Sequence, residues 1–183
     1  ERIEAQRRST ASRGAKNVEG QGILQDIDQA RQKGYLDVST PHNGAVFYDN
    51  GRVTLDQPDP KRADRRQVVS NRDRANEFCG KPGNEHCRTV EMTQGGQWLE
   101  QQRLYQGVLT NKQADRVWAN TSRDFAKSAS GEPNAFVRAD SAGHRNFSKI
   151  EKPALQHNKD VTAIHYHHNE REMLLHHRQT TQA

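Results

Sequence analysis

Apolar residues recur at helical spacing in two parts of the chain. Ile23, Leu24 and Ile27 mark one face of a segment that Gly34 can terminate. From Asn111, which can cap a helix, apolar residues return every three or four positions until residues 130–133, Ser-Gly-Glu-Pro, stop the pattern. We predict helices over both segments and one or two helical turns over residues 72–78.

Short apolar runs predict the remaining elements. Residues 45–48 form an apolar-aromatic run between turns, and residues 135–137 and 161–166 read as strands. A helical stretch between the last two predicts a small parallel sheet. Residues 56–66 read as a loop because Pro58 and Pro60 stand among clustered charges.

The fold class that follows is α/β. A linker or translocation remnant occupies residues 1–20, and a mainly helical N-terminal lobe occupies residues 21–112. A C-terminal lobe over residues 113–183 carries the small parallel sheet flanked by helices, and we expect the active site in the cleft between the lobes.

Composition narrows the class of protein. Hydrophobic residues make up 31% of the chain and mean hydropathy is −1.13, so the core must be small and no membrane span is expected. The net charge of +5 gathers in the first residues and near Lys61, in segments that we expect to be exposed. This favours an acidic small molecule or protein partner over a nucleic acid. Because the chain opens at Glu1 with no leader, we expect it to be cut from a longer polypeptide.

The two cysteines leave their redox state open. Cys79 and Cys87 flank residues 80–84, Gly-Lys-Pro-Gly-Asn, which favour a tight turn. The pair can form a disulfide in an oxidising compartment or remain as two thiols. Two cysteines exclude a four-cysteine zinc site.

Trp118, Ser122 and Phe125 share one helical face, at positions i, i+4 and i+7. That spacing by itself is typical of a helix that packs in a core. Glu151 changes the interpretation, because it stands inside the apolar segment of residues 150–155. A buried acid is unfavourable unless it is paired, neutral or useful.

These residues carry a resemblance to a known family. The pattern Trp118-x3-Ser122-x2-Phe125-Ala126-x2-Ala129-Ser130-Gly131, then Phe136-Val137, Glu151 and Asn158-x2-Val161-x2-Ile164, resembles the C-terminal half of the ADP-ribosyl cyclase/NAD+ glycohydrolase family. That family includes eukaryotic ectoenzymes and toxin domains of large bacterial adhesins, among them CdiA-like effectors of contact-dependent growth inhibition.

The earlier segments resemble the family less closely. Phe47-Tyr48 is similar to its aromatic-Trp motif, with Tyr48 where a Trp is usual, and residues 95–100 are similar to its Thr-Leu-Glu motif, which selects Glu100. An alternative match places residues 89–93, Thr-Val-Glu-Met-Thr, on the same motif and selects Glu91. Gln101 stands where the ectoenzymes usually have Asp, and their cysteine framework is absent.

The resemblance implies the following roles. Trp118 and Tyr48 would clamp the pyridinium of NAD+, since a cation over an aromatic ring gains ~0.5–2 kcal/mol. Phe47 would also bind the substrate. Glu151 would be the catalytic carboxylate, ionised and near the ribose, and Glu100 would contact the nicotinamide amide or position water. Ser122 and the backbone at Phe147 and Ser148 would bind the diphosphate. NAD+ is then the substrate, with no cofactor and no metal.

The resemblance also implies a biological setting. We expect a toxin domain secreted as the C-terminal part of a larger effector, acting in the target-cell cytoplasm and depleting NAD+. A cognate immunity protein would protect the producer. Of the two products, ADP-ribose and cyclic ADP-ribose, an open site with Tyr48 in place of Trp favours ADP-ribose.

Histidines supply the competing hypotheses. His168, Glu172 and His176 can share a helical face and bind a metal, although adjacent His pairs point in different directions. A metal-independent ribonuclease would pair His165 with His144 or His157 as general acid and base. A non-enzymatic binding module with basic arms is a third possibility.

Overall fold

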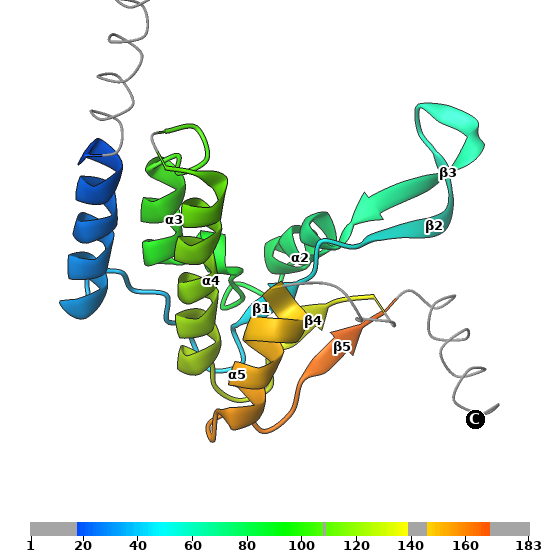
Figure 1. Ribbon diagram of the computed structural model, residues 1–183. Coiled ribbons are helices and arrows are strands. Elements are labelled where there is room, and N and C mark those ends of the chain that lie inside the picture. The colour runs from blue at the N-terminus through cyan, green and yellow to red at the C-terminus, as the bar shows by residue number, and fades with distance from the viewer. Residues whose placement is uncertain (1–17, 108, 139–145, 169–183) are drawn as a thin grey trace, which may run out of the picture.

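The computed structural model describes residues 18–107, 109–138 and 146–168 (Figure 1). A three-stranded parallel sheet lies at the centre, in the order β1 (Val46–Tyr48), β4 (Asn134–Phe136), β5 (His165–His167). The predicted mixed α/β class with a small parallel sheet is confirmed. The strand predicted over residues 161–166 begins later, because the Asn158 side chain forms a turn with Asp160 and leaves Val161 with an isolated bridge to Gly131.

Alternate residues of the strands face two different layers of helix. Phe47 and Ala135 pack with Phe125 of α4 (Asn111–Ser128) and with Leu155 of α5 (Lys152–His157). The intervening strand residues pack against α2 (Asn71–Gly80) on the opposite face. The strands are therefore covered on both sides, which explains why they appear in the sequence as short continuous apolar runs.

The helix predicted to begin at Asn111 does begin there, but the residue that caps it is Thr110. Thr110 is the N-cap: its hydroxyl accepts from the Gln113 backbone, and the Gln113 side chain accepts from the Thr110 N–H. This reciprocal capping box satisfies two backbone donors that the first turn of the helix leaves free. The start of α4 is thereby stabilised, and one face of this long helix carries Trp118 and Ser122, as predicted.

The N-terminal helix spans residues 18–32 and ends before Gly34, as the apolar spacing predicts. Its Ile27 packs with residues of α3 (Gln94–Gln101) and α4 in a second apolar cluster. Arg31 Nε lies 3.1 Å from Asp124 Oδ2 on α4. The N-terminal helix is thus anchored to α4 by packing and by one ion pair. No helix among the described residues is long and apolar enough to cross a membrane.

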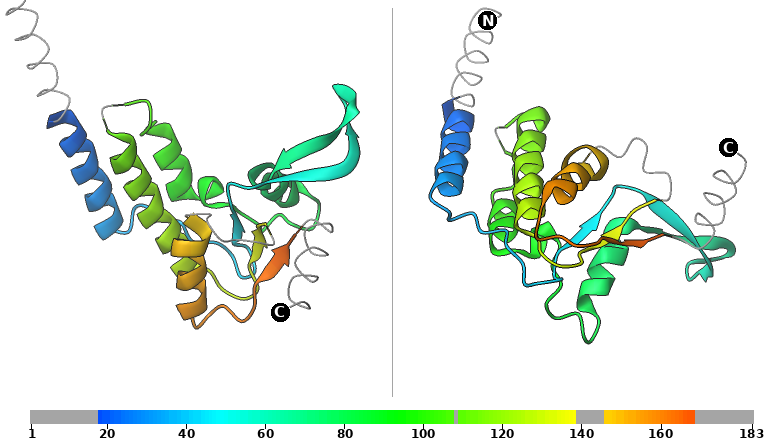
Figure 2. Two further views of the ribbon diagram at one scale, coloured as in Figure 1. Left: turned by 45° about the vertical axis from the view of Figure 1, so that its right-hand side comes forward. Right: turned by 90° about the horizontal axis from the view of Figure 1, so that it is seen from below.

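The loop predicted over residues 56–66 is wrong. This part of the chain forms the hairpin of β2 (Arg52–Asp59) and β3 (Arg62–Ser70), which projects from the body of the molecule (Figures 1 and 2). Pro58 is compatible with a strand here because a two-stranded ribbon leaves one edge of each strand unpaired. β1 of the predicted N-terminal lobe pairs with β4 of the predicted C-terminal lobe, so the sheet crosses the proposed division at residue 112. Cys79 and Cys87 are both free thiols.

Candidate active site

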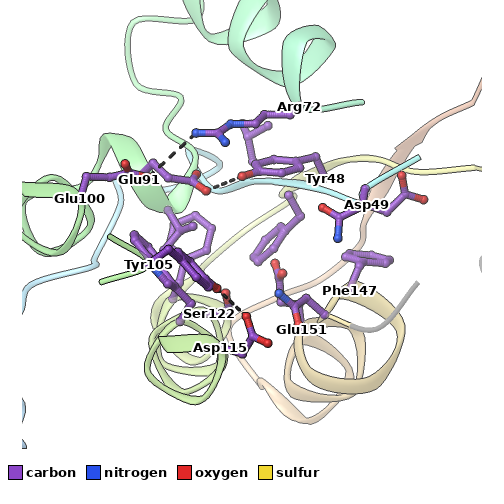
Figure 3. A pocket seen from close by; sticks show the side chains of 17 residues that line it. Tyr48, Asp49, Arg72, Glu91, Glu100, Tyr105, Asp115, Ser122, Phe147 and Glu151 are labelled. Atoms are coloured by element: carbon purple, nitrogen blue, oxygen red, sulfur yellow. Dashed lines mark hydrogen bonds and ion pairs between the residues drawn. The ribbon is translucent and has the colours of Figure 1, made fainter. Parts of the chain in front are cut away.

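A pocket of about 280 Å³ opens where β1 ends, and we call it the central pocket (Figure 3). In sheets with parallel strands, ligands bind outside the carboxyl ends of the strands. Besides β1, the central pocket takes side chains from α3, α4, the 3-10 turn Val90–Met92 and the π-helical turn Phe147–Glu151. Elements from both ends of the chain therefore meet at one cavity.

Three phenylalanines form its floor. Phe47 stacks at a tilt on Phe125, with ring centroids 4.9 Å apart, and Phe147 lies 6.3 Å from Phe47. All three are almost fully buried. Phe47 and Phe147, which the sequence suggested as substrate-binding residues, thus line the central pocket with little of their surface exposed. The half-buried Trp118 and Tyr48 form its side walls.

Glu151 is the unusual group of the central pocket. Its side chain is 7% exposed, and no protein group hydrogen-bonds to its carboxyl within the described parts of the chain. Burial and, second, the charge of Glu91 raise the pKa of Glu151 to about 8. Glu151 is therefore mostly protonated at neutral pH in the free protein, whereas the sequence predicted an ionised carboxylate.

Backbone geometry explains how Glu151 comes to point into the cavity. The Lys152 N–H bonds to the Phe147 carbonyl, five residues back, and so closes a π-helical turn. Pro153 follows and has no N–H to continue ordinary helical bonding to Lys149. Single π-helical turns occur frequently at functional sites. This one places Phe147 in the floor and Glu151 beside it (Figure 3).

The structure separates the two acids between which the sequence could not decide. Glu91 accepts a hydrogen bond from the Tyr48 hydroxyl inside the central pocket and acts electrostatically on Glu151. Burial and the same Glu91 charge raise the pKa of Tyr48. Glu100 lies at the rim, with its side chain 52% exposed and its Oε1 3.9 Å from Arg72 Nη2. The alternative motif match therefore selects Glu91, the acid whose charge raises the pKa of Glu151.

Close packing fixes the position of Glu91. Thr93 donates to the Val90 carbonyl and accepts from the Gly96 N–H, so the 3-10 turn and α3 are joined at one residue. A Cβ at Gly96 would lie 1.8 Å from the Val90 carbonyl oxygen. Only glycine allows α3 to approach this closely. Gly96 thus helps to hold Glu91 against Tyr48, whereas Gly95 packs against the backbone of Leu36 and Asp37.

Negative charge dominates the lining. The acids Asp49, Glu91, Glu100, Asp115 and Glu151 line the central pocket, and Arg72 is the basic residue among the lining residues. Asp49 differs from Glu151 because it accepts hydrogen bonds from the backbone of Gly51 and Arg138 and from the Asn71 side chain. Aromatic walls with several carboxylates favour a cationic ligand.

Ser122 lies on the same face of α4 as Trp118 and is 5% exposed, and both line the central pocket with Phe125. Their predicted common face is present in the structure. The sequence analysis missed Tyr105 and Asp115, whose side chains hydrogen-bond at the pocket mouth, at 2.6 Å. Asp115 precedes Trp118 by three positions and Ser122 by seven, so helical spacing carried a signal for it, whereas Tyr105 lies outside any periodic segment.

Comparison with known proteins finds a distant structural likeness. A search against protein-family models gives no match, and a search of curated proteins gives none. A crystal structure of Aplysia cyclase complexed with substrate NGD and product cGDPR is similar to this chain, with a TM-score of 0.42 and 18% identity. The similarity covers 78% of this chain, which spans 60% of the length of that structure.

The histidines that support the competing hypotheses lie apart from the central pocket, whose lining in the described structure includes no histidine. His165 Nε2 is 2.8 Å from Glu132 Oε2 at the exposed edge of β5, and His157 donates to the Pro153 carbonyl. His144, Glu172 and His176 lie outside the described residues. Within those residues, no group of three possible ligands is placed to hold a metal ion.

Proposed function

We propose that this chain cleaves the bond between nicotinamide and ribose in NAD+. One observation carries the proposal: Glu151, buried and without a hydrogen-bond partner among the described residues, lines a cavity with aromatic walls and further acids. A buried acid with a raised pKa inside a pocket is typical of a functional site. The resemblance in the sequence identifies the same residue.

Binding begins with the positive charge of the substrate. The pyridinium ring of NAD+ enters between Trp118 and Tyr48, where the ring faces attract it. Its charge lowers the pKa of Glu151 and so favours loss of the Glu151 proton to solvent. The ionised form that the sequence predicted is then produced by the substrate itself, and Glu91 adds a second negative charge nearby.

The bond between the ribose C1′ and the pyridinium nitrogen then breaks, and its electron pair leaves with neutral nicotinamide. Positive charge develops on the ribose, as in glycoside hydrolysis, and the Glu151 carboxylate stabilises it. Water adds hydroxide to C1′ and releases a proton, giving ADP-ribose. Attack by adenine N1 instead gives cyclic ADP-ribose. Because the leaving group is neutral, this step requires no metal ion.

An assay of the purified chain tests the proposal. Incubation with NAD+ should release nicotinamide, with ADP-ribose as the main product, and incubation with total RNA should leave the RNA intact. Glu132→Gln is the matched control for the Glu151→Gln variant. It alters an exposed carboxylate that pairs with His165 and does not line the central pocket. Intact NAD+ together with cleaved RNA would replace this function with the ribonuclease.

The setting as a delivered toxin domain is part of the same proposal and rests on the resemblance. Induced synthesis of the chain inside bacterial cells should lower NAD+ and stop growth, and the Glu151→Gln variant should do neither. An immunity protein should bind the folded chain and block nicotinamide release. Normal growth and normal NAD+ in cells that make soluble wild-type chain would contradict the toxin role.

A further inference from the structure

We propose that a depression beside the central pocket, built around Lys112 and Arg116 of α4, binds the diphosphate of the substrate and selects a dinucleotide over a nucleoside. We call it the Lys112 depression. It rests on the proposed function, since it concerns the same substrate. It moves the diphosphate away from Ser122 and Phe147 of the acidic central pocket, where the resemblance in the sequence had placed it.

The Lys112 depression opens into the central pocket. Both are lined by Asn50, Tyr105, Asp115 and Asn146, so a ligand can extend from one into the other. Its own volume is about 430 Å³. The central pocket, at about 280 Å³, is slightly smaller than the ~300–1,000 Å³ usual for ligand sites. One end of a dinucleotide fills it, and the remainder must continue into an adjoining space.

Charge decides which part of the substrate continues there. Phosphates are repelled by the acids of the central pocket, whereas Lys112 and Arg116 offer two cations with no ion pair in the described parts of the chain. Asn50 and Asn146 add amide donors. Asp115 is the acid of this depression, and its Oδ1 already accepts from the Tyr105 hydroxyl. The lining suits an anion with several oxygen acceptors.

The charge of Lys112 is unfavourable for the dipole of α4. Lys112 lies in the first helical turn, which contains no acidic residue. A cation there opposes the helix dipole, whose positive end is the N-terminus. Its placement is therefore unfavourable for the helix alone and is explained by an anionic ligand at the adjoining depression.

A second depression next to the central pocket is less suited to phosphate. Leu99, Leu104 and Trp118 contribute an apolar lining. Of its two arginines, Arg72 already lies 3.9 Å from the Glu100 carboxylate, while Arg103 is exposed. The Lys112 depression is the one whose two cations are both unpaired among the described residues, so the diphosphate is assigned to it.

The test compares substrates with and without phosphate. In the double variant Lys112→Gln/Arg116→Gln, kcat/KM for NAD+ should fall by about 10-fold or more through KM, because charge-assisted hydrogen bonds are lost. The kcat/KM for nicotinamide riboside, which has no phosphate, should stay within about 2-fold. ADP, which has the diphosphate and no pyridinium, should inhibit the wild type and lose its inhibition in the double variant.

The matched control removes the same charge from the same helix. Arg123→Gln/Lys127→Gln changes two exposed cations of α4 outside either depression and should leave all three measurements unchanged. Equal loss on NAD+ and nicotinamide riboside, unchanged ADP inhibition, or a larger loss in Arg103→Gln would overturn the assignment. A wild-type chain that cleaves neither substrate would instead overturn the proposed function.

Discussion

Two buried carboxylates at the central pocket differ in the number of hydrogen bonds that they accept. Asp49, at the end of β1, is 3% exposed and accepts three hydrogen bonds. Glu151, in the π-helical turn, is 7% exposed and accepts none from the described protein. The two carboxylates are buried to nearly the same extent, so they differ in hydrogen bonding and not in exposure. Asp49 is stabilised as part of the fold, and Glu151 remains available to a ligand.

This difference indicates that burial alone does not identify a catalytic acid. An ionised carboxylate that accepts several N–H donors is already stabilised in the free protein. A carboxyl without donors keeps its proton until a positive charge approaches, and this response to charge is what cleavage of a pyridinium bond requires. Substitution of Glu151 should therefore affect mainly activity, and substitution of Asp49 should affect mainly stability.

The largest expected effect is on catalysis. Glu151→Gln keeps the side-chain volume and removes the charge that would stabilise the developing cation. We expect kcat/KM for NAD+ to fall about 10²–10³-fold with the fold retained, measured by nicotinamide release and circular dichroism. Wild-type turnover in this variant would show that Glu151 is not the catalytic acid.

The second effect is on stability. Asp49→Asn places an NH₂ group against donors that now face a carboxylate oxygen, so that at least one buried N–H of Gly51, Asn71 or Arg138 loses its acceptor. We expect the free energy of unfolding in urea to fall by about 2–4 kcal/mol. The activity of the folded fraction should fall less than in Glu151→Gln. Unchanged stability would mean that the two carboxylates are not as different as their hydrogen bonds imply.

A third, smaller effect links Glu91 to Glu151. If the reaction needs ionised Glu151, kcat/KM should rise with pH up to the Glu151 pKa of about 8. Glu91→Gln removes a neighbouring negative charge, so the inflection should move to lower pH, while the Gln oxygen can still accept from Tyr48. Glu100→Gln is the control at the pocket rim and should leave the inflection in place. An inflection that moves only in Glu100→Gln would restore the first motif match.

The parts of the fold that were predictable depend on local periodicity. α4 shows its apolar face in the spacing of Val117 and Phe125, and the sheet strands appear as apolar runs because both faces are covered. The β2–β3 hairpin carries no such signal, since it projects with mostly exposed, charged side chains and contains Pro58. Its pairing depends on register between strands, which no local period encodes.

The candidate site follows the same division. Trp118 and Ser122 could be placed together from helical spacing, and Glu151 stood out as an acid among apolar residues. The preference for Glu91 over Glu100 required the contact of Gly96 with Val90, which joins two elements tightly. Tyr105 reaches the pocket mouth from a connection without periodic pattern. These residues depend on tertiary packing and are not visible in spacing.

The last effect is also the most direct test of the environment of Glu151. Folding raises the Glu151 pKa from about 4.5 to about 8, so between these values the native chain retains a proton that the unfolded chain has lost. The contribution of Glu151 to stability is therefore fully present below pH 4.5 and decreases as pH rises to about 8. Glu151→Gln has no proton to lose. Its melting temperature relative to wild type should rise across this window, by about 3 °C or more at pH 8. A difference between variant and wild type that stays constant with pH would show that burial does not raise the pKa of Glu151 in the free protein.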